Sequence, residues 1–536
     1  MNTSHKLINN SSLTKVARSG AVILSGLLML TAVGCKKNFE KNATDGTGIP
    51  DSEIKLPTLL PPLQSAIFRN YQIAQNLSAD GFSGYMMSPN PFKANYDLNY
   101  SPVDDWDKAG FNDQYTYVMA PVNKMARLGL RTANPDLWAI ALIVKVEAMH
   151  RVTDKFGPIP YSAVGKTLTN TPYDSQQSVY NQFFNELDTA VNNLQTFQTA
   201  NPGAKPFTAY DRIYNGDYSK WIKFANSLRL RLAMHIVKAD PATAKLQAEK
   251  AMSAAGGLLT DVTDNAAIAV APGSVNDLFQ LTNDYSDSRL GATLATYLLG
   301  YKDPRLTSFA SPATDPAFAG QYIGIRIGSN IPSKSAYITY ASLNVDKTFK
   351  IMAPQQIMTA AEIWFLKAEA GLRGWANAGD PKANYEKGIT VSMSQWGVTD
   401  ATAYINDATS KQADYVDPKN TVNNIKAVST MTIKWDDAAS NEVKLERIMT
   451  QKWLAVFPEG QEAWTEFRRT GYPKLFPVVN NTSNGLIDTQ IQIRRLPYPS
   501  NEKTSNGVEL AKAIQSIGGQ DNGGVRVWWD LAKGNF

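Results

Sequence analysis

Cysteine and histidine are scarce in this sequence, with one cysteine and three histidines in 536 residues. A single thiol excludes an intrachain disulfide and a zinc site built from cysteines. His150 and His235 do not stand in the His-x-x-x-His or His-Glu-x-x-His spacings of helical metal sites. We therefore expect no metal, no cofactor and no Ser-His-Asp triad, and we interpret both histidines as packed or surface residues.

Acidic residues are missing from the first 20 positions, which carry Lys6, Lys15 and Arg18. An apolar stretch follows at residues 21–33. It is about 13 residues long, whereas a membrane-spanning helix needs about 20. A basic start before a short apolar core is typical of a secretion signal and not of a membrane anchor.

The end of the apolar stretch resembles the lipobox of bacterial lipoproteins, in which small residues precede a cysteine. Here Thr31, Ala32, Val33 and Gly34 lead to Cys35. We predict that residues 1–34 are a removed signal and that Cys35 is the lipidated first residue of the mature protein. Two or three acyl chains anchor a protein firmly, whereas one is marginal. The alternative is an ordinary signal peptide with a cysteine there by chance.

Charge of one sign does not dominate the chain, which has 53 basic and 48 acidic residues and a net charge of +5. No block of lysine and arginine of the nucleic-acid-binding type is present, so we expect no nucleic-acid partner. The mature chain, about 500 residues, exceeds the usual size of one core. It is therefore either two domains or one large helical domain with insertions.

Apolar residues recur at helical spacing along much of the chain. Residues 56–77 predict a first helix, and residues 137–148 carry a clear stripe at Leu137, Ile140, Ala141, Val144 and Ala148. Ala361, Trp364, Phe365 and Ala368 mix small and aromatic residues on one face, as helical repeats of the tetratricopeptide type do. The match to a 34-residue period is loose.

Residue composition and hydrophobic pattern divide the mature chain into four parts. Residues 35–53 are polar and predict a flexible, lipidated tether. Residues 54–257 predict an N-terminal helical scaffold interrupted by a loop at 80–110. Residues 258–350 are rich in Gly, Ser, Asp, Asn and Pro and predict a loop-rich insertion, and 351–536 predict further helical repeats with a loop-rich tail. The fold class is mostly α.

Short segments spread over the chain carry a family resemblance. They lie at residues 154–161, 173–176, 211–217, 221–231, 303–306, 361–370, 385–389, 462–473 and 494–499. Their order and spacing behind a lipobox resemble the SusD/RagB family of nutrient-binding lipoproteins, in particular its SusD-like branch. The resemblance covers most of residues 50–536.

The resemblance implies a tetratricopeptide-like helical scaffold whose loop-rich insertion forms a ligand face. It also implies a lipid-anchored protein of the outer membrane, facing the outside, that acts as a lid on a SusC-like TonB-dependent transporter. The ligand would be a glycan or, as in some relatives, a peptide, and it would be bound without being cleaved. A helical-repeat scaffold without a small ligand is a further alternative.

Two loops have the mixture of rings and polar groups that holds sugars, since Trp and Tyr rings stack on pyranose faces while Asn, Asp and Arg bind hydroxyls. The alternative is that these rings pack the loops onto the scaffold. The first loop has one tryptophan and the second none, so a peptide or an unusual glycan remains open. The candidate ligand-binding residues are Tyr85, Tyr96, Tyr100 and Trp106 in the first loop, and Tyr285, Arg289, Tyr322 and Tyr337 in the second.

Glu462 and Glu466 suggest an enzyme, because two carboxylates are the machinery of a glycoside hydrolase. They are four residues apart on a predicted helix and would project together, whereas catalytic carboxylates flank a bond in a cleft. We therefore predict no catalysis and interpret the pair as solvated or paired with arginine. Similarly, we expect Arg229 and Arg231 to pair with acids such as Glu362 or Glu369.

Overall fold

The structure is a computed structural model, and it describes residues 53–93, 95–167 and 170–536. The predicted signal peptide, Cys35 and nearly all of the tether lie outside the described residues. Leu56–Phe536 forms one compact unit. In this described part of the chain, no helix is both long and apolar enough to cross a membrane.

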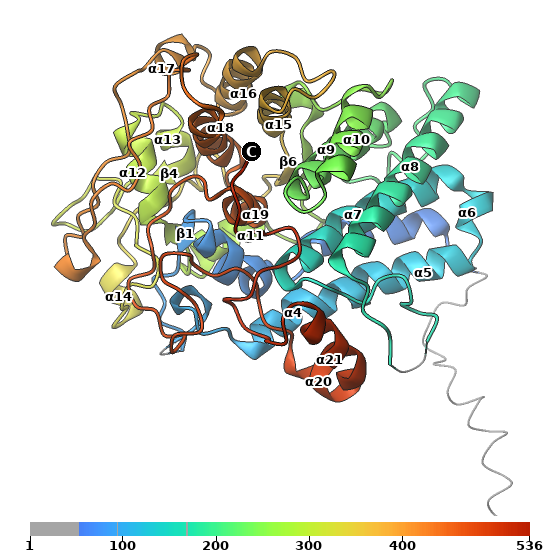
Figure 1. The fold of residues 1–536 in the computed structure, drawn as a ribbon, viewed down its shortest axis with the longest axis horizontal. Coiled ribbons are helices and arrows are strands. Elements are labelled where there is room, and N and C mark those ends of the chain that lie inside the picture. The colour runs from blue at the N-terminus through green and yellow to red at the C-terminus, as the bar shows by residue number, and fades with distance from the viewer. Residues whose placement is uncertain (1–52, 94, 168–169) are drawn as a thin grey trace, which may run out of the picture. The chain divides into compact units, whose positions relative to one another are not determined.

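Helices make up most of the first half of this unit (Figure 1). They are η2 (Leu56–Leu59), α3 (Leu60–Ser65), η3 (Ala66–Phe68), η4 (Gln72–Asp80), η5 (Asp97–Asn99), α4 (Asp104–Gln114), η6 (Tyr115–Met119), α5 (Ala120–Arg127), α6 (Leu130–Ala133), α7 (Pro135–Phe156), α8 (Gln176–Ala200), α9 (Tyr218–His235) and α10 (Pro241–Met252).

Helix α7 is the central element of this half, and its residues from Asp136 to Phe156 are all buried. Pro135 occupies the first helical position, where its missing N–H costs nothing. The helix ends at Phe156 because Gly157 adopts a positive φ of 91° and Pro158 cannot continue the helix. The predicted stripe from Leu137 to Ala148 therefore lies in the core.

The second half contains the insertion and a further set of helices. They are η7 (Val262–Asp264), α11 (Asp277–Phe279), η8 (Gln280–Asp284), α12 (Ala292–Gly300), α13 (Leu306–Phe309), α14 (Lys334–Tyr337), α15 (Ala360–Leu372), α16 (Pro381–Gln395), α17 (Thr402–Ile405), η9 (Thr421–Asn423), α18 (Asn441–Val456), α19 (Gly460–Thr470), α20 (Ser500–Ser505) and α21 (Gly507–Ser516).

Strands are short and pair only in twos, always antiparallel, within the described residues. β1 (Met86–Met87) pairs with β3 (Arg289–Leu290), β2 (Ala266–Ile268) with β6 (Gln355–Met358), and β4 (Ala310–Ser311) with β5 (Ser342–Leu343). The predicted mostly α fold class is confirmed. The proposed boundaries after residues 257 and 350 remain a prediction.

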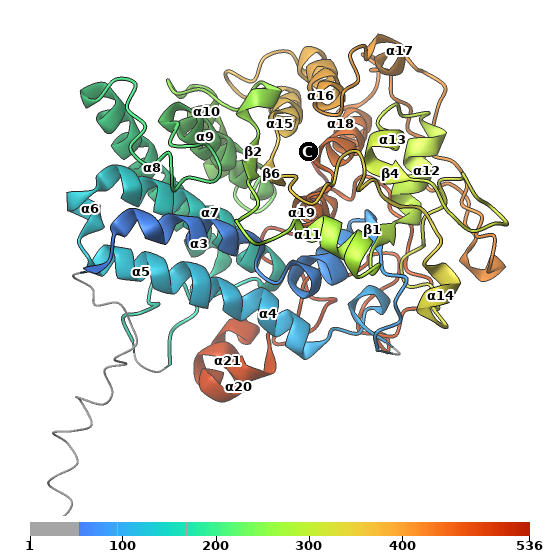
Figure 2. The same ribbon diagram turned by 180° about the vertical axis from the view of Figure 1, so that it is seen from behind.

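The two groups of helices meet along α9. Figure 1 and the reverse view in Figure 2 show α7 and α8 on one side of α9 and α15, α16 and α18 on the other, with the insertion's α12 to α14 at the opposite end of this unit from α8. Helix α19 lies between these groups, and its residues from Gly460 to Thr470 are all buried. The scaffold therefore holds the insertion against the loop that contains β1.

Candidate functional site

The two loops predicted to hold the ligand lie against each other. The antiparallel pairing of β1 with β3 joins Met86 to Leu290. The carboxylate of Asp287 then links three segments, because it accepts hydrogen bonds from Gln72 Nε2 at 3.1 Å, Asn90 Nδ2 at 3.1 Å and Lys334 Nζ at 2.7 Å. The loops that the sequence presented separately thus form one surface.

A cleft of about 560 Å³ opens in this surface. Amide side chains dominate its polar lining, and such groups suit the hydroxyl and acetamido groups of sugars because each amide both donates and accepts. The lining residues are Pro91, Asn95, Tyr96, Asn99, Ser329, Asn330, Ile331, Pro332, Asn480 and Thr482. We call this the amide cleft.

Asn99 holds the amide cleft together. Its side-chain amide donates to the backbone oxygens of Gly328 at 3.2 Å and Asn480 at 3.3 Å. The backbone oxygen of Asn99 accepts hydrogen bonds from the backbone N–H and the hydroxyl of Thr482, both at 2.8 Å. The segment around Asn480 and Thr482 is thus a third wall of the site, which sequence reasoning missed because an Asn- and Thr-rich loop carries no periodic signal.

Three aromatic rings form a cluster, and one of them, Tyr96, lines the amide cleft. The ring centroids of Phe92, Tyr96 and Trp106 lie 5.7–6.1 Å apart in edge-to-face geometry. Phe92 is 37% exposed and Trp106 is half-buried, whereas Tyr96 is 2% exposed. The Tyr96 hydroxyl has no hydrogen-bond partner among the described residues. Burial, and the nearby Asp97 and Asp287, raise its pKa, so it stays a neutral donor.

Two of the predicted tyrosines, Tyr85 and Tyr100, lie in the core. The Tyr85 hydroxyl donates to the backbone oxygen of Trp453, and the Tyr85 ring packs 5.1 Å from Phe457. Tyr100 is buried, with its ring 6.3 Å from Phe82. Both side chains fix the first loop to the scaffold, so we leave them out of the proposed contact set.

Arg289 and Tyr337 are also buried in the insertion. Arg289 Nε donates to the backbone oxygen of Ile338 at 2.7 Å, so the guanidinium supports the loop that follows α14. The hydroxyl of Tyr337 accepts a hydrogen bond from Asn423 Nδ2 at 3.2 Å, and its ring lies 4.8 Å from Tyr340. Both side chains therefore support the loops of the insertion from the inside and are not exposed on the predicted ligand face.

Tyr285 and Tyr322 reach the surface. Tyr285 is 45% exposed and borders a second cleft of about 480 Å³, whose polar lining includes Arg69, Asn70, Gln72 and Gln280. Tyr322 is half-buried and packs against the main core. The structure therefore brings the rings of Tyr96 and Trp106 together, with Tyr96 lining the amide cleft, and places Tyr285 at a different cleft.

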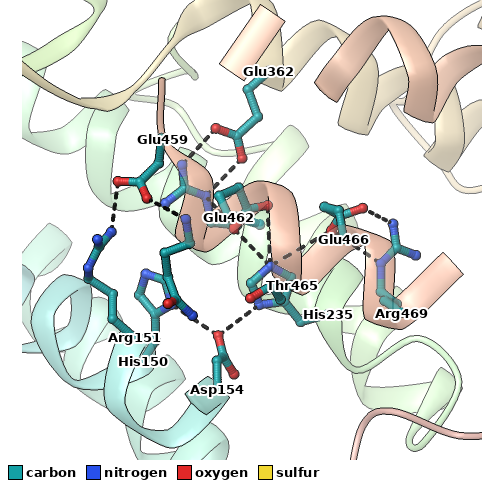
Figure 3. Close-up of polar contacts among 12 residues, drawn as sticks. His150, Arg151, Asp154, His235, Glu362, Glu459, Glu462, Thr465, Glu466 and Arg469 are labelled. Atoms are coloured by element: carbon teal, nitrogen blue, oxygen red, sulfur yellow. Dashed lines mark hydrogen bonds and ion pairs between the residues drawn. The ribbon is translucent and has the colours of Figure 1, made fainter. Parts of the chain in front are cut away.

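The predicted carboxylate pair, Glu462 and Glu466, belongs to a buried network of charged residues between α7, α9, α15, α18 and α19 (Figure 3). Lys452 Nζ contacts Glu462 at 2.9 Å, and Arg469 contacts Glu466 at 2.5 Å. Neither glutamate lines the clefts described above. Both carboxylates are paired with cations, as expected for a structural role.

The arginines predicted to pair with acids do so with different partners. Arg231 contacts Glu362 at 2.6 Å in the network, as predicted. Arg229 instead contacts Asp188 on α8 at 2.5 Å. Glu369 is held by Arg469 at 2.6 Å and by Arg373 at 2.7 Å.

His150 and His235 are both buried in the network, on either side of Asp154 (Figure 3). His150 Nδ1 lies 3.2 Å and His235 Nδ1 3.5 Å from Asp154 Oδ2, a donor set that is chemically able to hold a divalent metal. Although burial alone would lower the His235 pKa, Glu462 and Asp154 raise it to about 9. A protonated imidazole repels a metal, so we interpret these contacts as ion pairs.

Comparison with known proteins identifies relatives over nearly the whole chain. The model of the SusD-like family, described as SusD and RagB outer membrane lipoprotein, matches residues 38–530. No curated protein sequence matches the chain.

Solved structures match it closely. A chitin-binding SusD homolog from Flavobacterium johnsoniae is 40% identical with a TM-score of 0.86, covering 90% of this chain and 100% of that one. A SusD homolog from Bacteroides vulgatus is 37% identical with a TM-score of 0.85, covering 90% and 98%. One from Bacteroides thetaiotaomicron is 34% identical with a TM-score of 0.83, covering 90% and 100%.

Proposed function

The chain belongs to the SusD-like family of SusD and RagB outer-membrane lipoproteins, and from this premise we propose that it binds a glycan at the cell surface without cleaving it. The bound glycan then passes to a SusC-like TonB-dependent transporter in the same membrane. Lipidation of Cys35 and the polar tether at 36–53 hold the binding unit outside the cell.

The observation that carries this proposal is the amide cleft beside the aromatic cluster. The exposed ring of Phe92 and the half-buried ring of Trp106 offer apolar surfaces on which a pyranose face stacks. Asn95, Asn330 and Asn480 supply donors and acceptors for hydroxyl groups. The unpartnered Tyr96 hydroxyl supplies one more donor.

We infer that an oligosaccharide of N-acetylated amino sugars is the first ligand to test. The relative with 40% identity binds chitin, and its structure aligns with 90% of this chain. Side-chain amides match the acetamido group well, because the two groups exchange a donor and an acceptor in the same geometry. A volume of about 560 Å³ falls in the range of small-ligand sites.

The test measures binding of chitooligosaccharides to the full lipidated protein in detergent micelles by isothermal titration calorimetry. We expect Phe92→Ala and Trp106→Ala each to weaken binding about tenfold, the effect of losing roughly 1.4 kcal/mol of stacking. Leu246→Ala, which removes an exposed apolar side chain on α10, is the matched control. If all three variants bind chitooligosaccharides as tightly as the parent protein, the amide cleft is not the binding site.

Hydrolysis is measured in the same samples. Release of shorter sugars by the parent protein would contradict the proposal, because it requires catalytic carboxylates at the ligand. If the protein binds peptides and no glycan, the proposed ligand class is wrong. The site is then tested by measuring peptide binding to Phe92→Ala and Trp106→Ala.

A further inference from the structure

A third, larger cavity lies at the C-terminal end of α19, with a volume of about 720 Å³. Its walls come from the segments around Leu475, Gln492 and Ala532, which are far apart in the sequence. It shares no residue with the amide cleft. Among the described residues its charged lining is entirely cationic: Lys238, Arg468, Arg469, Lys474, Arg494, Arg526 and Lys533. We call it the basic cavity.

Some of these cations are neutralised from behind the cavity wall. Arg469 contacts Glu369 at 2.6 Å and Glu466 at 2.5 Å. Arg494 and Arg526 share a single carboxylate, that of Asp530, at 2.5 and 2.6 Å. Two guanidinium groups against one carboxylate leave a positive charge uncompensated.

The other cations, Lys238, Arg468, Lys474 and Lys533, make no ion pair with any described carboxylate. The Arg468 guanidinium lies 3.6 Å from the Trp464 ring centroid and 4.8 Å from that of Trp529. It donates to backbone oxygens of Asp154 at 2.6 Å and Arg494 at 2.9 Å, which carry no full negative charge. No described carboxylate lies within ion-pair distance of this buried guanidinium. Burial lowers its pKa, and the attraction of Asp530 and Asp154 offsets only part of that effect.

Two lysines of the lining also lack a carboxylate partner among the described residues, one of them buried and one exposed. Lys238 is buried and donates to the backbone oxygen of Lys533 at 3.0 Å. Burial, and then the neighbouring Arg469, lower its pKa to about 8. Lys474 is exposed and lies 4.5 Å from the Tyr472 ring centroid. An anion in the cavity would relieve the mutual repulsion of these groups.

We propose that the basic cavity binds a small oxyanion, that is, a carboxylate, sulfate or phosphate group. The cations converge on one concave space, and Lys238, Arg468, Arg469 and Arg494 are each more than nine-tenths buried. Buried cationic donors form strong charge-assisted hydrogen bonds with oxyanions. The volume exceeds that of an inorganic ion, and Phe467 and Leu475 add an apolar wall, so a sugar acid also fits.

This proposal does not depend on glycan binding at the amide cleft. Its test titrates the full lipidated protein in micelles, at constant ionic strength, with inorganic phosphate, inorganic sulfate and glucuronate, and with neutral glucose as a reference. We expect at least one anion to bind and glucose not to bind. Binding of glucuronate alone assigns the cavity to a carboxylated sugar, and binding of phosphate or sulfate assigns it to a free inorganic anion.

The variant Lys474→Gln/Lys533→Gln removes two exposed charges that make no ion pair, so it should fold like the parent. We expect it to weaken anion binding by tenfold or more, about one charge-assisted hydrogen bond. Lys302→Gln/Lys347→Gln is the matched control, because it removes the same net charge from two exposed lysines that make no ion pair with a described carboxylate and do not line the basic cavity.

Equal anion binding by both double variants would overturn the proposal, and so would the absence of binding by all three anions. Binding of a polyglutamate peptide without binding of any small anion would also overturn it, since the basic cavity would then be a protein interface. Phe92→Ala should weaken chitooligosaccharide binding about tenfold while it keeps the parental anion affinity. The failures of the two proposed sites are therefore distinguishable.

Discussion

At the scale of single residues, His235 couples the protein's stability to pH. Glu462 lies 3.2 Å from its Nε2 atom, and the His235 pKa is raised to about 9 against about 6.5 in an unfolded chain. A raised folded-state pKa stabilises the fold fully below about pH 6.5. That stabilisation, roughly 3 kcal/mol, is lost as the pH rises through about 9.

We therefore predict that the difference in free energy of unfolding between the parent and His235→Gln shrinks between pH 6.5 and pH 10, because the contribution of His235 is lost over that range. The measurement is urea unfolding of the parent and the variant at a series of pH values. Lys245→Gln, at an exposed site, should keep the parental pH dependence. If the free energy of unfolding of His235→Gln changes with pH as steeply as that of the parent, His235 is not the titrating group.

Glu462 illustrates how a pair that suggests catalysis in the sequence becomes structural in the fold. Lys452, Arg231 and His235 surround its carboxylate and, against the effect of burial, hold its pKa well below the usual range. The sequence left two interpretations open, a solvated pair and a pair bound by arginine, and the structure adds Lys452 and His235 as partners of Glu462. The sequence did not show which cations would be the partners, because Lys452 and Arg231 lie on other helices, which meet α19 only in the folded chain.

We predict that Glu462→Gln destabilises the protein by about 3–5 kcal/mol, because it leaves buried cations without their counter-ion. Chitooligosaccharide affinity should stay at the parental value under conditions in which the variant is folded. Urea unfolding and calorimetry measure the two effects, and Asp346→Asn on the exposed surface is the control for stability. Unchanged stability together with lost binding would instead make Glu462 a ligand contact.

At the scale of secondary structure, apolar stripes predicted the amphipathic helices and missed other kinds. α7 and α15 follow their predicted spacing. The first predicted helix is instead divided into η2, α3, η3 and η4. The break between η3 and η4 falls at Asn70, which takes a left-handed conformation with φ of 51°. Helix α12 in the insertion is buried on nearly all sides, so it shows no polar face by which a stripe is recognised.

The ligand face depends on contacts between loops that no local pattern encodes. The pairing of β1 with β3 and the bridge from Asn99 to the 480–482 segment join positions some 200 to 380 residues apart. Sequence reasoning therefore found the two aromatic loops and not which of their rings face outward. The burial of Tyr85 and Tyr100 and the exposure of Phe92 emerge only from these long-range contacts.

We predict that Asn99→Ala loosens the walls of the amide cleft, because it leaves the Gly328 and Asn480 backbone oxygens without that donor. Hydrogen–deuterium exchange should increase in residues 328–332 and 478–482 while α7 stays protected. Chitooligosaccharide affinity should fall about tenfold, in keeping with the loss of one buried hydrogen bond. Asn344→Ala, whose amide serves the distant Thr307 oxygen, should leave both measurements unchanged.

At the scale of the whole molecule, the short segments that carried the family resemblance were sufficient to place nearly the entire chain, and the match over residues 38–530 confirms that assignment. Several of these segments are structural: Arg231, Glu362, Glu369, Glu462 and Arg469 all belong to the buried network. The residues that identify the family thus build its frame. The ligand face that we propose is made of other segments.

The separation of frame and anchor leads to a prediction for Cys35→Ser. Acylation requires the thiol, so the variant should lose labelling by a palmitate analogue and leave the outer-membrane fraction. Its folded unit should bind chitooligosaccharides like the parent, because the amide cleft lies wholly within Leu56–Phe536. Fractionation after metabolic labelling measures the anchor, and calorimetry measures the site. Since Cys35 is the chain's one thiol, labelling that persists in the variant would place the lipid on another residue and contradict the lipobox.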